Sequence, residues 1–128
     1  MSEQKNIIPL GRQDFDRDLG KLEAELILMS GLVEQAIFNA LNALKSRDID
    51  KSQKVIDEDD NIDQTELEIE RSCIELIRRE APMAGDLRRI VASLHIAGEL
   101  ERIGDYAEGI AKISIKMGGQ PPLKELID

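Results

Sequence analysis

The sequence has few aromatic residues and no tryptophan. Among 128 residues only Phe15, Phe38 and Tyr106 are aromatic, so the core has to be built from leucine, isoleucine, valine, alanine and methionine. β-Sandwiches and barrels usually recruit aromatic and β-branched residues, so this composition favours helices. With 41% hydrophobic residues, the chain can form one domain with a real core and is too short for two.

Cysteine and histidine are also scarce, which excludes several kinds of site. Cys73 is the only cysteine and His95 the only histidine, so neither an internal disulfide nor a four-ligand Cys/His zinc site can form. A di-iron oxygenase of the helical-bundle type needs Glu-x-x-His motifs, but Ala92 stands three residues before His95. We expect His95 to be a partly exposed helix residue and Cys73 to be a small buried hydrophobe.

Motifs that would indicate an enzyme are missing as well. The sequence has no glycine-rich phosphate loop and no G-x-S-x-G motif. We therefore predict that the protein is not an enzyme and has no organic cofactor.

Basic residues are too few for nucleic-acid binding. Acidic residues outnumber basic ones 26 to 17, giving a net charge of −9, so the basic footprint that displaces phosphate counterions is missing. A chain with this negative charge is expected to bind cations or basic protein surfaces rather than anionic lipid. The first 16 residues lack the apolar core of a signal peptide, and no run approaches ~18 uncharged apolar residues. We expect a cytoplasmic protein.

The first helix is predicted from Asp14 to about Arg47. Apolar residues recur there at alternating steps of four and three, which is typical of a coiled-coil-like seam. The seam consists of Phe15, Leu19, Leu22, Leu26, Met29, Val33, Ala36 and Ala40, and is widened by Leu28, Leu32, Ile37, Leu41 and Leu44.

Two further helices are predicted, over about 49–79 and 83–117. Asp48 or Asp50 can cap the start of the second helix, and Pro82 disfavours its continuation. Gly118 and the glycine after it end the third helix. The prediction is therefore an all-α fold, an antiparallel up-down-up three-helix bundle of long helices.

The bundle is expected to occupy residues 12–117. A flexible segment is predicted over 1–11, and a tail or the start of a following helix over 118–128.

The second helix places carboxylates between two apolar stripes. On a helical wheel Asp59, Asp63, Glu66 and Glu70 fall in the gap between these stripes. One stripe consists of Val55, Ile62, Ile69, Cys73 and Leu76, the other of Ile56, Leu67 and Ile74. Residues four apart point the same way on a helix, so these acids repel one another and need compensation.

The third helix repeats this anomaly. An apolar line through Leu87, Val91 and Leu94 leads to Glu101 and Asp105 along the same side of the helix. The apolar arc then continues elsewhere, through Ile96, Leu100, Ile103, Ala107 and Ile110. Both helices thus offer carboxylates at positions i and i+4.

Two interpretations of these acids stay open from spacing alone. In the first, arginines pair with them, since bidentate arginine–carboxylate pairs are common. The available arginines are Arg71, Arg78, Arg79, Arg88, Arg89 and Arg102. In the second, two facing carboxylate pairs bind one or more cations, because hard cations and high-spin iron take carboxylate oxygens.

The sequence also resembles the PhoU family of phosphate-transport regulators. Residues 86–111, DLRRIVASLHIAGELERIGDYAEGIA, resemble the third helix of a PhoU repeat and contain its hallmark L-E-R-I-G-D. Residues 55–70, VIDEDDNIDQTELEIE, are similar to the second helix, and RREAPMAGDLRRI to the turn before the third. The resemblance covers nearly all of 12–117 and implies a three-helix repeat, which is normally present twice in a family member.

The resemblance implies a metal site. The E(D)-x-x-x-D motifs of the family, which bind multinuclear metal clusters in some members, map onto Asp59–Asp63 and Glu101–Asp105. These four residues are the expected ligands of iron, zinc or another divalent cation cluster. Secondary candidates are Asp60, Glu66, Glu70, Glu99 and Glu108.

The resemblance further implies a regulatory adaptor. Family members act as negative regulators of phosphate uptake and couple the phosphate-specific ABC transporter to the sensor histidine kinase of the phosphate regulon. They would meet the membrane only through such partners. A metal-storage or metal-buffering bundle without a signalling partner is the alternative, and a plain oligomerising bundle is a third.

A single repeat is expected to self-associate, most simply as a homodimer. The sister repeat of the family fold is missing, so an apolar face should stay uncovered. The expected patch consists of Leu28, Leu32, Ile37 and Leu41.

Overall fold

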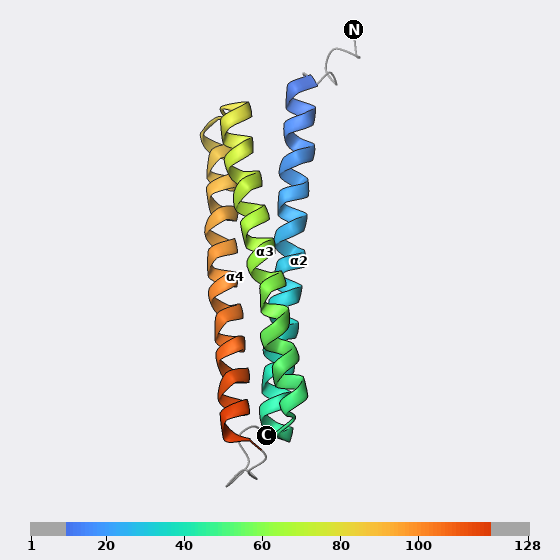
Figure 1. Ribbon diagram of the computed structural model, residues 1–128. Helices are drawn as coiled ribbons and strands as arrows, with labels where there is room; N and C mark the ends of the chain where they lie inside the picture. Colours follow the sequence, from blue (N-terminus) through green and yellow to red (C-terminus); the bar gives the residue numbers. More distant parts are fainter. Residues whose placement is uncertain (1–9, 119–128) are drawn as a thin grey trace.

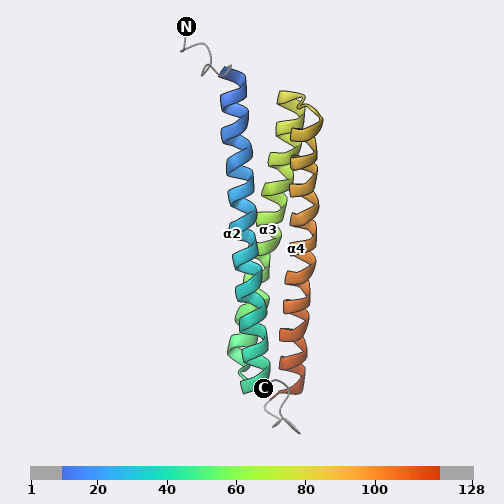
Figure 2. The same ribbon diagram turned by 180° about the vertical axis from the view of Figure 1, so that it is seen from behind.

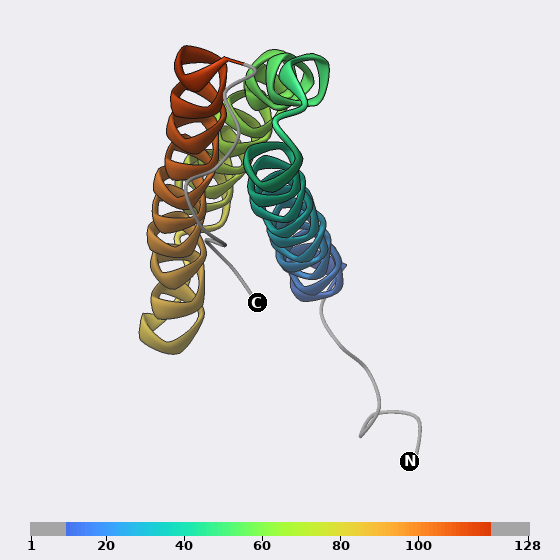
Figure 3. The same cartoon turned by 90° about the horizontal axis from the view of Figure 1, so that it is seen from below.

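Three long α-helices make up nearly all of residues 10–118, the part of the chain that the computed structural model describes. Helices α2 (Leu10–Ser46), α3 (Ile49–Glu80) and α4 (Ala84–Met117) lie side by side (Figures 1 and 2). Seen from below, they stand at the corners of a triangle (Figure 3), and each helix contacts both others. The predicted all-α, up-down-up bundle is confirmed.

The predicted terminal segments lie almost wholly outside the described residues. Of the segment 1–11, only Leu10 and Gly11 are described, and they already form the start of α2, four residues before the predicted Asp14. Of the segment 118–128, only Gly118 is described, where it caps α4 with a positive φ of 59°.

The turn between α2 and α3 consists of Arg47 and Asp48. Arg47 adopts a left-handed conformation with φ of 57°, which reverses the chain. Asp48 is the N-cap of α3, because its Oδ1 accepts a hydrogen bond from the Lys51 N–H at 3.0 Å. The predicted cap is confirmed, and it starts α3 within two residues of the end of α2.

The turn between α3 and α4 lies at the opposite end of the bundle (Figure 1). Ala81 ends α3 in the left-handed conformation, donating its N–H to the Ile77 carbonyl at 3.2 Å, and Pro82 follows. Asp86 lies in the first turn of α4, where its charge favours the helix N-terminus. Arg12 of α2 pairs with Asp86 and joins the start of α2 to this end.

Large apolar residues fill the core at the end of the bundle where α2 begins. The seam predicted for α2 is buried from Phe15 to Val33, and the first apolar stripe of α3 is buried as well. The buried cluster consists of Phe15, Leu19, Leu22, Leu26, Met29, Val33, Ile62, Ile69, Cys73, Leu76, Ile90 and Ala97.

Small residues fill the core at the other end. The buried cluster there consists of Ala40, Val55, Ala107 and Ala111. The side chains of Ser52 and Ser114 are fully buried beside them. The core at this end is therefore built from little side-chain volume, and small side chains of this kind allow helix backbones to approach closely.

The buried face of α4 differs from the predicted one. Its buried residues are Ile90, Ser93, Ala97, Gly104, Ala107, Ala111 and Ser114. Leu87 and Val91 are exposed, as are Ile96 and Ile103 of the predicted arc. The prediction was wrong for these four large residues, because close helix packing selected small ones. It was right for Ala107, which is buried, and Leu94, Leu100 and Ile110 are partly buried against the core. In the second stripe predicted for α3, Leu67 and Ile74 are exposed, whereas Ile56 is partly buried against the core.

The apolar patch predicted on α2 is exposed in part. Leu28 and Leu32 are exposed, whereas Ile37 and Leu41 are half-buried.

Candidate functional site

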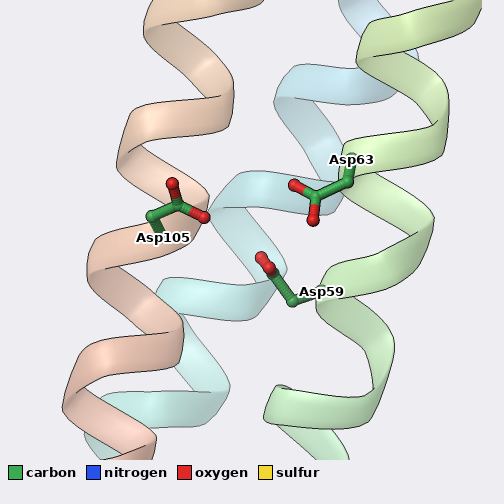
Figure 4. Close-up of side chains that lie close together, drawn as sticks. All are labelled: Asp59, Asp63 and Asp105. Carbon is green, nitrogen blue, oxygen red and sulfur yellow. The ribbon is translucent and has the colours of Figure 1, made fainter.

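Three carboxylates from two helices meet between α3 and α4. Asp59 and Asp63 lie one turn apart on α3, and Asp105 faces them from α4 (Figure 4). One carboxylate oxygen of each residue lies within 4.8 Å of those of the other two. The structure thus brings together three of the four residues predicted as metal ligands.

Two oxygens in this cluster are buried without a hydrogen-bond partner. Asp59 is only 4% exposed, although its side chain carries a carboxylate, and Asp63 is half-buried. Among the described residues, no donor reaches Oδ1 of either aspartate. Buried carboxylate oxygens without partners are costly, so these two atoms are suited to a cation.

Glu101, the fourth predicted residue, lies one turn before Asp105 on α4. Its carboxyl group lies close enough to Asp105 and Asp63 for the three groups to influence one another's titration. Partial burial, followed by the hydrogen bond to Asp105 and the charges of Asp105 and Asp63, raises the pKa of Glu101 well above its usual range. Glu101 therefore extends the cluster toward the end of the bundle where α4 begins.

Burial and mutual repulsion perturb the aspartates in the same direction. Burial is the largest cause that raises the pKa of Asp59 from 3.8 to about 7, followed by the charges of Asp63, Glu108 and Asp105. Burial and the charges of Asp105 and Glu108 also raise the pKa of Asp63. Without a bound cation, the cluster therefore holds protons near neutral pH.

Arginine pairing does not offset this repulsion within residues 10–118. Arg79 pairs with Asp18 at 2.6 Å, Arg89 with Glu23 at 2.8 Å and Arg102 with Glu99 at 3.6 Å. None of the ion pairs in this part of the chain includes a carboxylate of the four predicted ligands. Beside the cluster, Lys112 pairs with Glu108 at 3.2 Å.

Comparison with known proteins shows the family of this chain. Residues 26–114 match a protein-family model described as the PhoU domain, which is more than half of the chain. This chain belongs to the PhoU family. The resemblance seen in the sequence is confirmed.

Curated PhoU relatives are longer than this chain. A phosphate-specific transport system accessory protein PhoU homologue of Aquifex aeolicus is 40% identical over 112 residues, which are 88% of this chain and 51% of the relative. The homologue of Zymomonas mobilis is 42% identical over 98 residues, 77% of this chain and 41% of the relative. The PhoU protein of Escherichia coli K12 is 32% identical over 106 residues, 83% of this chain and 44% of the relative. The chain spans about half the length of these relatives.

The secondary candidates divide into two groups. Glu108 belongs to the cluster, since it contributes to the raised pKa of Asp59 both through its charge and through a hydrogen bond. Glu66 and Glu70 continue the row of acids along α3, and burial together with Glu70 raises the pKa of Glu66. By contrast, Asp60 is exposed and Glu99 is turned toward Arg102.

His95 and Cys73 take no part in the cluster. His95 is exposed, as expected. Cys73 is fully buried, and its thiol donates to the Ile90 carbonyl at 3.7 Å. Burial raises the pKa of this thiol to about 11, so it remains protonated and unreactive at neutral pH.

Gly104 is a site residue that the sequence reasoning did not single out. It is buried within the PhoU hallmark motif on α4. A Cβ at this position would lie 3.2 Å from Ile62 Cγ2 and 3.5 Å from Asp59 Oδ1. The missing side chain thus lets α4 bring Asp105 toward the acids of α3. A glycine inside a long predicted helix is a signal for such close packing.

Replacing Gly104 by valine should separate the two helices at the cluster. We expect Gly104→Val to lower the free energy of unfolding by about 2 kcal/mol relative to Gly98→Val, because valine overpacks the contact with Ile62. Gly98 is the matched control, since it lies on the same helix and a Cβ there has open space. Urea unfolding of both variants measures the difference. Equal stabilities would show that the close approach at Gly104 is not required.

Proposed function

We propose that this PhoU-family chain is a regulatory accessory component of phosphate transport. It would act without catalysis at the cytoplasmic side of a phosphate-specific transporter, lowering phosphate uptake and the output of a sensor histidine kinase. Support comes from the family match over residues 26–114 and from relatives that are named accessory proteins of phosphate-specific transport. The acidic composition fits contacts with basic protein surfaces rather than with anionic lipid.

The second part of the proposal is that the carboxylate cluster binds a divalent cation. The observation that carries it is the pair of buried, unpartnered oxygens on Asp59 and Asp63, facing Asp105. A donor set made only of carboxylates suits manganese, iron(II), magnesium or calcium better than a soft metal, with zinc also accepted. Asp59, Asp63, Glu101 and Asp105 would hold the cation.

Cation binding would link the two helices that carry the ligands. When bound, the cation supplies positive charge that offsets the repulsion among the four carboxylates. Because Asp59 and Asp63 lie on α3 and Glu101 and Asp105 on α4, this linkage fixes the spacing of α3 and α4. We propose that metal occupancy thereby sets the shape of the surface that the transporter or kinase recognises.

A cellular complementation experiment tests the regulatory proposal. The chain is expressed in a bacterial strain that lacks its own PhoU protein and carries a reporter of phosphate starvation. The wild-type chain should lower reporter output in phosphate-rich medium and should co-purify with a transporter or kinase subunit. Asp59→Asn/Asp105→Asn should lose this repression, whereas Glu68→Gln, at an exposed acid of α3 outside the cluster, should keep it.

The outcomes separate the two parts of the proposal. Repression by the double variant at wild-type strength would contradict a regulatory role for the cluster. A wild-type chain that carries a high metal load but neither represses nor co-purifies with a partner would instead favour metal buffering.

A further inference from the structure

A lysine ends the row of acids on α4. Residues three and four positions apart share one side of a helix. Four charged residues follow one another along α4 at steps of four, three and four positions, namely Glu101, Asp105, Glu108 and Lys112. Asp105 in this row points toward the acids of α3 (Figure 4). The ammonium group of Lys112 is thus the one positive charge within a row of carboxylates.

Glu108 connects this lysine to the carboxylate cluster. Its Oε1 accepts a hydrogen bond from the Lys112 ammonium at 3.2 Å. Glu108 is also close enough to Asp59 and Asp63 for its charge to raise the pKa of both. Within residues 10–118, no other ion pair includes Glu108 or one of the four predicted ligands. Glu108 therefore lies between the acids of the cluster and the one cation that pairs with them in this part of the chain.

The ammonium of Lys112 stays at the outer edge of the cluster. The Lys112 side chain is 58% exposed, whereas that of Glu108 is 24% exposed. Deeper in, Asp59 is only 4% exposed, and among the described residues no donor reaches its Oδ1 or that of Asp63. A cation between α3 and α4 would therefore reach carboxylate oxygens that Lys112 does not.

We propose that Glu108 is a further ligand of the cation and that the cation displaces Lys112 from it. In the metal-free protein the Glu108 carboxylate is bound to Lys112. In the loaded protein this carboxylate turns to the cation, and the ammonium of Lys112 is released to solvent. The inference rests on the cation site proposed above, and it identifies Lys112 as the residue that regulates the affinity of that site.

The pair between Lys112 and Glu108 is weak enough for this exchange. Water screens an ion pair in which one side chain is more than half exposed, so the pair contributes little to stability. A divalent cation carries twice the charge of an ammonium group and would attract Glu108 more strongly at the same distance. The lysine side chain is also flexible along its four-carbon stem, so its ammonium can leave without moving the helix.

The exchange would make cation occupancy visible on the surface of α4. In the metal-free protein Lys112 and Glu108 neutralise each other. In the loaded protein Lys112 presents an unpaired positive charge to solvent. A partner protein can distinguish these two states by charge complementarity, in addition to the helix spacing proposed above.

Isothermal titration calorimetry of the full chain with manganese(II), repeated with zinc, tests the exchange. At fixed pH and ionic strength, Lys112→Gln should raise the affinity about fivefold, because the competing charge is removed. Lys112→Arg should lower it about threefold, because an arginine can hold Glu108 through two hydrogen bonds, as Arg89 holds Glu23. Lys116→Gln is the matched control, since it removes a positive charge from an exposed residue one turn farther along α4, and it should bind like the wild type.

A variant of Glu108 shows whether Lys112 acts through this carboxylate. Glu108→Gln should bind manganese(II) at least ~10-fold more weakly than the wild type. Adding Lys112→Gln to this variant should change the affinity by less than about twofold, because the two residues act as one unit. Far-UV circular dichroism checks that each variant is helical, and Glu108→Ala replaces Glu108→Gln if that variant is not.

The outcomes separate this inference from the cation site on which it rests. A wild type that binds neither manganese(II) nor zinc would overturn both. A wild type that binds, with Lys112→Gln and Lys112→Arg equal to it, would overturn the inference alone. So would a Lys116→Gln variant whose affinity rises as much as that of Lys112→Gln. A rise caused by Lys112→Gln that persists in the Glu108→Gln background would likewise overturn the exchange.

Discussion

Adding manganese, iron(II) or zinc to metal-free protein is expected to raise its melting temperature by about 10 °C. A ligand that binds only the folded state stabilises it by about 2.7 kcal/mol at a hundredfold excess over Kd, and a chain of this size gains several degrees per kcal/mol. The physical reason lies in the cluster of Asp59, Asp63 and Asp105, whose mutual repulsion a cation relieves. Thermal melts in EDTA and with each metal measure the shift.

Replacing Glu101 by glutamine and Asp105 by asparagine should abolish this response. The metal-free double variant should be as stable as the wild type or more stable, because two repelling charges are removed. If arginines held these acids in place, the double variant would instead be weaker, since an arginine would lose its partner. A wild-type melt that no metal shifts, together with a weakened double variant, would contradict the proposed cation site. Glu68→Gln is the control that should respond to metal like the wild type.

Raising the pH from about 4 to about 8 is expected to destabilise the metal-free protein. The pKa of Asp59 is about 7 in the folded state and near 3.8 in the unfolded state. Between these values the folded state binds one more proton than the unfolded state, so stability falls as pH rises, and the loss is complete above pH 7. The rise from 3.8 to about 7 corresponds to up to about 4 kcal/mol.

The Asp59→Asn variant isolates this contribution from other titrating groups. Its free energy of unfolding should match that of the wild type near pH 4 and exceed it by a few kcal/mol near pH 8. Urea unfolding in EDTA at several pH values measures both curves. Parallel curves across this range would show that Asp59 has the same pKa in the folded and the unfolded protein.

The sequence predicted α2 and the helix ends well because the signals were local. The seam from Phe15 to Val33 consists of large residues at regular steps, and such a stripe has to be buried somewhere. Asp48 and Pro82 act through hydrogen bonds and steric limits within a few residues of themselves. These features therefore needed no knowledge of the neighbouring helices.

The face of α4 could not be predicted in the same way. Ala97, Gly104 and Ala111 are buried in the contact of α4 with its neighbours, and this depends on the packing of all three helices. A hydropathy pattern gives such small residues little weight beside Leu87 or Val91. The i and i+4 spacing identified the acids within each helix. Predicting which carboxylates meet across the two helices would have required the register between α3 and α4.

The placement of the two turns at opposite ends of the bundle has a consequence for folding order. Each turn allows the adjoining helices to pair locally, but the start of α2 is far in sequence from the residues of α3 and α4 that it contacts. Arg79 reaches Asp18 across 61 residues, Arg89 reaches Glu23 across 66, and Arg12 reaches Asp86 across 74. Such contacts close long loops and form late, so the first turns of α2 should dock last and exchange their amide hydrogens soonest.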